Sequence, residues 1–343
     1  MKILNPNDFF LKFQNCSFEN NVMKLMPKTS LLQTFGQVFD FRGDADEEKF
    51  DFFYRYCQSH LDEYSKIYNF HPAYLYIAQN EYFNSVAQPK TNVIAISKEV
   101  IKQLKNFFWD NLDFENDQSL INFRDINKWL LAECNKSLNQ FVFEFASFFS
   151  YYHELAHLMQ EAEYKALGNT TSLNEYGYTN SNFNVEHHLR EIDSDFFAAN
   201  QVAYHVLSLY EDAKIFFNEV ENEILYNIIM LSMASIFAYR IRHFRGLEDI
   251  YYYERSHPHS AIRIIIISKV FLSFLSKHSK NLTPDEQQIL IGNSLGFADK
   301  IAGVNYSSRF SDLIKNGNDK IAEYWDYMSN ESPKYSYLLT GRI

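Results

Sequence analysis

Residues 137–159 read SLNQFVFEFASFFSYYHELAHLM and carry the strongest structural and chemical signals of the chain. Ser137 followed by Gln140 has the form of a capping box, which marks the start of a helix. From Phe141 to Met159, large apolar side chains recur at steps of 4, 3, 4, 3 and 4 residues. This spacing predicts one long amphipathic α-helix.

The same helix contains the pentapeptide HELAH, from His153 to His157. Residues four apart lie on one helical face, so the two histidines can bind one metal ion, while Glu154 can reach a water molecule at that ion. So short a pattern also arises by chance, and its histidines are then ordinary residues of a helix. A catalytic zinc needs a third protein ligand and one open position, so the rest of the chain has to supply that ligand.

Known solutions of this motif differ in the source of the third ligand. In the metzincin solution the helix stops at a Gly three residues after the second His, and a third His follows. Gln160 and Glu163 occupy those positions here, which excludes that solution. In the gluzincin solution a Glu comes from a second helix. An apolar stripe at helical spacing over residues 185–206 predicts such a helix, beginning near Asn184.

Glu191 and Asp195 share a face of this second helix, next to its apolar stripe. Glu191 is therefore predicted as the third metal ligand, and Asp195 as an acceptor that orients a metal-bound imidazole through its free N–H. Asp193 points elsewhere and is predicted to be solvated, without influence on the metal. His188 lies one turn before Glu191 and, with the adjacent His187, remains an alternative as a rival ligand or pocket residue.

A further signal is the segment SHPHSAIRI, residues 256–264. Pro258 favours a helix start at this point. Just ahead of that helix, His257 is predicted to project into a cleft and hold the oxyanion of a tetrahedral intermediate, and Arg263 to anchor His257 or a substrate carbonyl. Taken alone, a His-Pro pair is usually only a turn.

Two short runs rich in β-branched and aromatic residues, 74–78 and 92–96, are bounded by turn formers and predict strands of a small sheet. Ser97 is placed to cap a following helix over residues 98–108. The polar segment 110–119 is predicted as a surface insert. The remainder of the chain has mainly helical patterns.

Together these motifs resemble the gluzincin zinc peptidases of the HtpX and CAAX-prenyl-protease type, which carry HExxH, ExxxD and Ser/Thr-His-Pro-x4-Arg-Ile in this order. The resemblance covers residues 74–267; residues 83–87 are similar to the family's Asn-Ala-Phe-Ala segment, and 93–96 to its edge strand. It implies an α+β, predominantly α-helical fold with a zincin-like core and a small β-sheet edge. By this resemblance, one Zn²⁺ is held by His153, His157 and Glu191, and Asp195 orients a metal-bound imidazole. Glu154 activates water, and substrate or transition-state contacts come from Asn84, His257 and Arg263. An extended peptide adds to the edge strand, which contains Val93, Ile94 and Ala95.

The chain also departs from that family. Ser85 stands where relatives usually have Ala, Ala156 stands where Gly is frequent, and residues 106–135 look inserted. The membrane helices of most relatives are missing. The expectation is therefore a cytoplasmic peptidase without membrane insertion, and the Lit-type phage-exclusion peptidases are a second, weaker resemblance of suitable size and location.

Composition excludes several classes of function. With 32 Lys and Arg against 43 Asp and Glu, the net charge of −11 disfavours binding to nucleic acid or anionic lipid. Three cysteines without metal-ligand spacing suggest a reducing compartment, and the turn formers in residues 1–8 argue against a signal peptide. The uncharged run 224–239 is shorter than the roughly 20 residues of a membrane span and is predicted to be a core helix.

No repeat or linker divides the chain, which predicts a single unit, 1–343, with a helical region 1–70, a catalytic core 71–279 and a second helical region 280–343. The expected function is a zinc-dependent endopeptidase acting on a protein or peptide substrate. One alternative is a catalytically silent, sensor-type protein of the same fold, with a role in phage defence. Another is a helical scaffold with accidental motifs. The sequence leaves the oligomeric state open.

Overall fold

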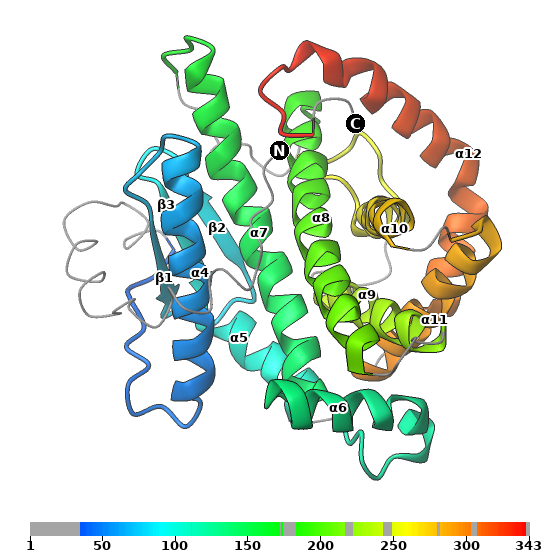
Figure 1. Ribbon diagram of the computed structural model, residues 1–343. Coiled ribbons are helices and arrows are strands. Elements are labelled where there is room, and N and C mark those ends of the chain that lie inside the picture. Colours follow the sequence, from blue (N-terminus) through cyan, green and yellow to red (C-terminus); the bar gives the residue numbers. More distant parts are fainter. Residues whose placement is uncertain are drawn as a thin grey trace.

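The protein is described by a computed structural model, which covers residues 35–110, 112–171, 173, 183–216, 222–242, 249–279, 282–302 and 307–340. Within these residues α-helices dominate, and a three-stranded sheet lies along one side of the helices (Figure 1). The predicted α+β class with a predominance of helix is therefore confirmed. Residues 1–34 of the predicted helical region 1–70 lie outside the described residues.

In chain order, helix α4 comes first, the three strands follow, and the rest of the described elements are helices. The strands are β1 (Tyr74–Ala78), β2 (Ser85–Gln88) and β3 (Val93–Ser97). The α-helices are α4 (Glu47–Ile67), α5 (Lys98–Lys105), α6 (Arg124–Cys134), α7 (Leu138–Ala166), α8 (Val185–Phe216), α9 (Asn222–Arg242), α10 (Ser260–His278), α11 (Pro284–Ala302) and α12 (Ser307–Glu331). Three short helical turns are η2 (Asn106–Asp110), η3 (Gln118–Phe123) and η4 (Ser332–Lys334).

Helix α7 is the predicted long helix, and its start is capped as expected. The Ser137 side chain accepts a hydrogen bond from the Gln140 backbone N–H at 3.2 Å. The helix is not amphipathic in the predicted sense, because every residue from Phe141 to Glu161 is buried. α4 and the sheet lie on one side of α7, while α8 and α9 pack against it from the other (Figure 1). α7 is thus the centre of the core.

Helix α8 begins at Val185, which confirms the predicted second helix. It packs between α7 and α10 (Figure 1). This arrangement puts the HELAH face of α7, the first third of α8 and the start of α10 next to one another. The three segments that carry the predicted site residues therefore meet in space.

The sheet corrects one prediction about the site. The two predicted strands exist as β1 and β3, but a third strand, β2, pairs antiparallel with β3. Because β1 pairs parallel with the other side of β3, the strand order is β1-β3-β2 and β3 is central. The expectation that Val93, Ile94 and Ala95 form a free edge strand is wrong, since both backbone edges of β3 are occupied.

The segment after β3 also differs in detail from the prediction. Ser97 caps α5 as expected, but the α-helix ends at Lys105 and continues as the π-helical turn η2. The predicted surface insert 110–119 is exposed at several positions and is anchored by the buried side chains of Leu112 and Phe114. Apolar residues within a polar segment thus tie it to the core.

Helix α9 contains the apolar run that was predicted to be a core helix. Among the described helices, its segment Glu223–Ile241 is long and apolar enough to cross a membrane, and 78% of it is buried inside the protein. A buried core helix passes the same test of length and composition, so the segment is weak evidence for a membrane span.

The central position of β3 gives a stability prediction. Ile94 is fully buried, so Ile94→Ala is expected to lower the free energy of unfolding by about 2–5 kcal/mol, against about 0.5–1.5 kcal/mol for the control Ile94→Val. Ile94→Pro is expected to prevent folding, because proline is not tolerated in a central strand. Urea unfolding followed by circular dichroism measures these effects. A folded, stable Ile94→Pro protein would contradict the central position.

Candidate metal centre

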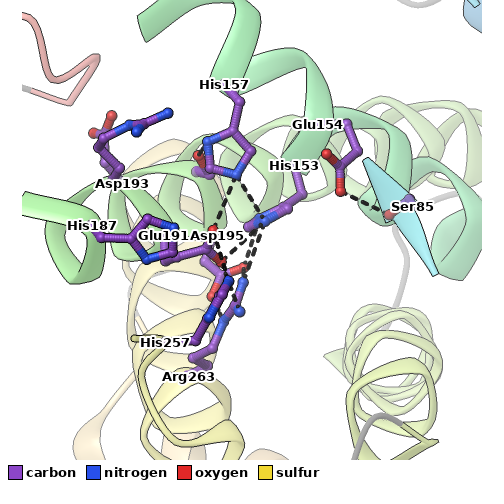
Figure 2. A network of polar contacts seen from close by, with 12 residues as sticks. Ser85, His153, Glu154, His157, His187, Glu191, Asp193, Asp195, His257 and Arg263 are labelled. Carbon is purple, nitrogen blue, oxygen red and sulfur yellow. Dashed lines mark hydrogen bonds and ion pairs between the residues drawn. The ribbon is translucent and has the colours of Figure 1, made fainter. Parts of the chain in front are cut away.

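Two helices supply the three predicted metal ligands. His153 and His157 lie one turn apart on α7, and Glu191 faces them from α8 (Figure 2). The two Nε2 atoms are 3.3 Å apart. Glu191 Oε1 lies 3.3 Å from His157 Nε2, and its Oε2 lies 3.5 Å from His153 Nε2. All three side chains are buried.

These separations fit a small metal ion. In a tetrahedral site with bonds of about 2.1 Å to nitrogen and oxygen, neighbouring ligand atoms are about 3.4 Å apart. The three observed distances agree with this value, so little movement is needed for the side chains to surround an ion. The prediction that these residues could hold a metal ion is confirmed at this level.

Glu154 lies beside this cluster and points away from the ligands (Figure 2). Its Oε1 accepts a hydrogen bond of 2.8 Å from Ser85 Oγ, at the start of β2. Ser150 Oγ lies 3.2 Å from Ser85 Oγ and accepts a hydrogen bond of 3.1 Å from the Tyr239 hydroxyl. A row of hydroxyl groups from β2, α7 and α9 therefore fixes the carboxylate of Glu154.

Asp195 lies behind His153, as predicted. Its Oδ1 is 3.1 Å from His153 Nδ1, although the N–H direction is not aligned for a regular hydrogen bond. Arg240 and Arg263 both pair with the same carboxylate. Burial alone would raise the pKa of Asp195, but the charges of the two arginines outweigh burial and hold that pKa well below its usual range. Asp195 is therefore a buried anion.

Arg263 contacts the metal-binding carboxylate itself. Its Nη1 lies 2.9 Å from Glu191 Oε2. Against the effect of burial, this charge and the two histidines hold the pKa of Glu191 well below its usual range. Arg263 Nη2 is 3.4 Å from His153 Nε2; because a guanidinium can only donate, this nitrogen of His153 presents its lone pair. Arg263 thus pairs with both Glu191 and Asp195, and its role toward His257 or a substrate carbonyl stays a prediction.

His257 lies at the open side of the cluster. Its side chain is 51% exposed, and its Nε2 is 4.0 Å from Glu191 Oε1. His187 stacks edge-to-face on His257, with 4.5 Å between ring centres. His187 Nδ1 donates to the Ser256 carbonyl at 2.6 Å, and burial lowers the pKa of His187 to about 4. His187, Glu191 and His257 form a second group that could hold a metal ion. Glu191 is the residue that the two groups share.

Two residues of α8 have structural partners that the sequence did not reveal. His188 is not a rival ligand, since both of its ring nitrogens have other partners. Its Nε2 donates to the Arg255 carbonyl at 2.8 Å, and its Nδ1 lies 2.7 Å from the Tyr324 hydroxyl. The prediction that Asp193 is solvated is wrong, because its side chain is fully buried. Burial raises the pKa of Asp193. α12 and the segment that follows it cover this face of α8 (Figure 1).

The predicted substrate-binding residues lie apart from one another. Asn84 is exposed just before β2, and its backbone exchanges hydrogen bonds with Ser97. Val93, Ile94 and Ala95 are fully buried in β3, as described above. Of this group, only Asn84 lies where a ligand could reach it.

Sequence reasoning missed several residues of the site. Arg240 is the first charged residue after the uncharged run 224–239, and its place at the end of a core helix was the one signal that the sequence offered. Ser85 was noted only as a departure from a family pattern. Gln160 follows His157 by three residues, and on a helix this spacing puts its amide within reach of the imidazole.

Comparisons with protein-family models, with curated proteins and with solved structures found no match to this chain. The functional argument therefore depends on the geometry of the site.

Proposed function

We propose that the chain is a zinc-dependent endopeptidase that hydrolyses peptide bonds of a protein substrate. The observation that carries this proposal is the buried cluster of His153, His157 and Glu191, with the carboxylate of Glu154 beside it. Two imidazoles and one carboxylate are a ligand set typical of catalytic zinc sites. A zinc ion at this cluster would polarise a substrate carbonyl and make a water molecule more acidic.

Glu154 is proposed as the general base. Among the described interactions, Arg240 and Arg263 pair with Asp195 and Glu191 but not with Glu154. The charge of Glu154 is therefore not neutralised by either arginine. The hydrogen bond from Ser85 holds one of its oxygens and leaves the other to accept a proton from water. The same carboxyl group can then protonate the leaving amine.

His257 is proposed as the donor to the oxyanion of the tetrahedral intermediate. The Ser256 hydroxyl lies 2.9 Å from His257 Nδ1; when this hydroxyl donates, the imidazole proton is on Nε2, on the side of Glu191. Burial lowers the pKa of His257, which favours a neutral ring with a single N–H. The half-exposed side chain can reach a substrate, and the neighbouring His187 limits its rotation.

The substrate is proposed to bind in extended form along β2. This strand is at one end of the sheet order, and no strand among the described residues pairs with its outer side. A peptide can add to such an edge by backbone hydrogen bonds. Ser85 joins this edge to Glu154, so a peptide here would pass close to the proposed base.

The cytoplasm is the proposed location, since Cys57 and Cys134 are free thiols.

The contact between Ser85 and Glu154 gives a direct prediction. Ser85→Ala is expected to lower kcat about tenfold, because a hydrogen bond to a charged group contributes about 1.5 kcal/mol, while metal content stays unchanged. Ser150→Ala is the matched control: it removes a hydroxyl one step further from the carboxylate and is expected to have a smaller effect. Equal turnover of wild type and Ser85→Ala would show that this contact does not position Glu154.

The proposed function is tested by comparing new protein termini in cells that express the wild type or Glu154→Gln, together with metal analysis of both purified proteins. New termini with the wild type alone, and one zinc per chain in both proteins, are the expected result. Zinc in both proteins without any new terminus would favour the sensor-type alternative. The absence of metal from the wild type would favour the scaffold.

A further inference from the structure

Gln160 connects the metal site to the far side of α8. Its side chain is fully buried. The amide Nε2 lies 3.0 Å from the Arg190 carbonyl and 2.8 Å from Asp193 Oδ2. A backbone carbonyl can only accept, and a carboxylate with several donors around it acts as an acceptor. The NH₂ of Gln160 must therefore face these two groups, which fixes the orientation of the amide.

This orientation determines the tautomer of a metal ligand. With its nitrogen on Arg190 and Asp193, Gln160 presents Oε1 to His157 Nδ1 at 3.1 Å. An amide oxygen can only accept, so His157 Nδ1 carries the proton and Nε2 carries the lone pair. Ser194 Oγ, 3.2 Å from the same Nδ1, is compatible with this because a hydroxyl can accept or donate. The lone pair of Nε2 then points toward Glu191 and His153, as metal binding requires.

Asp193 is held in turn by the last described segment of the chain. The backbone N–H groups of Leu339 and Thr340 donate to its two oxygens, each at 2.9 Å, and the Thr340 hydroxyl donates at 2.6 Å. With Gln160, each carboxylate oxygen accepts two hydrogen bonds. Tyr337 and Leu338 are buried in an apolar cluster with residues of α8, so the segment is anchored on the helix.

We propose that residues 337–340 and the buried pair Asp193 and Gln160 are positioning residues that set the tautomer of His157 and thereby the metal affinity. The order of the contacts is Thr340, Asp193, Gln160 and His157. Displacement of this segment from α8 would therefore weaken metal binding, although the segment contains no ligand. This inference rests on the metal site of the proposed function but not on hydrolytic activity.

The test uses the full-length chain and two measurements. Zinc affinity is measured by competition with a chelator, and the tautomer of His157 is read from two-bond ¹⁵N–¹H correlations of the metal-free protein. Loss of an outer partner of a metal-bound histidine usually lowers metal affinity 10–100-fold. We expect this loss, with a mixture of His157 tautomers, for Asp193→Asn and for Gln160→Met. Thr340→Val removes one hydroxyl donor from the same carboxylate and is expected to lower the affinity less.

Two further variants distinguish the relay, which is the series of contacts from Thr340 through Asp193 and Gln160 to His157, from the effect of a changed charge on α8. Glu186→Gln also removes one negative charge from α8 and can still accept the hydrogen bond from the Tyr337 hydroxyl, so wild-type zinc affinity is expected. Gln160→Glu keeps an acceptor for His157 Nδ1 but repels Asp193, so the Nδ1–H tautomer is expected to persist while the segment loosens.

The inference is overturned if folded Asp193→Asn and Gln160→Met bind zinc within twofold of the wild type and keep His157 protonated on Nδ1. Thr340→Val, which changes only the hydroxyl group, gives the answer if the other variants do not fold: unchanged affinity and tautomer then count against the relay. If the wild type binds zinc but cleaves no protein, the proposed function is wrong, while this inference about metal affinity is unaffected.

Discussion

Glu154→Gln is expected to lower peptide hydrolysis by about 10²–10⁴-fold, the usual contribution of a positioned general base. Glutamine cannot take a proton from water, but it can still accept the hydrogen bond from Ser85 Oγ, so the local structure should persist. Steady-state kinetics on a cleaved protein substrate, with zinc measured on the same samples, gives the result. Retention of one zinc per chain is part of the expectation, because Glu154 is outside the ligand cluster.

The control for this change is Glu144→Gln. Glu144 is a buried carboxylate on the same helix and pairs with Lys136. It is expected to alter stability and not turnover per zinc-loaded molecule. If Glu154→Gln retained full activity, or if it lost its zinc, the assignment of Glu154 as the base would be wrong.

His153→Ala is expected to abolish zinc retention, with an affinity loss greater than the 10–100-fold that removal of an outer partner causes. Two ligands remain after this change, and a stable zinc site uses three or four. The metal-free variant should nevertheless stay folded, because Arg240 and Arg263 still neutralise Asp195 and Glu191. Metal analysis after dialysis, together with thermal unfolding in chelator, measures both effects.

His188→Ala is the matched control, because it also removes a buried histidine near the site. It leaves the Tyr324 hydroxyl and the Arg255 carbonyl without their partner, which costs about 1–3 kcal/mol for each buried polar group left unpaired. Loss of stability with unchanged zinc affinity is the expected result. Zinc loss by His188→Ala, or zinc retention by His153→Ala, would show that the ligand set is different.

The sequence predicted the helices of the metal cluster correctly, since their signals are local. The i, i+4 spacing of the histidines and the periodic stripe on α8 depend only on helix geometry, and a capping side chain contacts residues within one turn. Glu191 could be found because it lies on the same face of α8 as Asp195. For such residues, sequence spacing and spatial proximity are nearly the same information.

The errors arose where partners are distant in the sequence. Asp193 lies on the opposite side of α8 from Glu191 and Asp195, and the sequence pattern alone predicted that this side is exposed to solvent. A segment about 150 residues further along covers it. The same limit applies to Arg240 and Arg263, which reach Asp195 from two other helices.

The error about the sheet had a different cause. Residues 93–96 read VIAI, and an uninterrupted apolar run is typical of a strand buried on both faces. That signal was present, but the edge assignment came from a family resemblance. β2 reads SVAQ, too short and too polar to be recognised before its partner is known.

The apolar helix α9 has a consequence for the synthesis of the chain. α9 packs against α7 and α8, which precede it, and against α11, which ends about 60 residues further along. At a translation rate of about 5–20 residues per second, the face of α9 that α11 covers waits about 3–12 s for its partner. During that time a segment with the length and apolarity of a membrane span is accessible on the ribosome. The nascent chain is therefore a candidate client for chaperones that bind apolar helices, although the finished protein buries most of this surface.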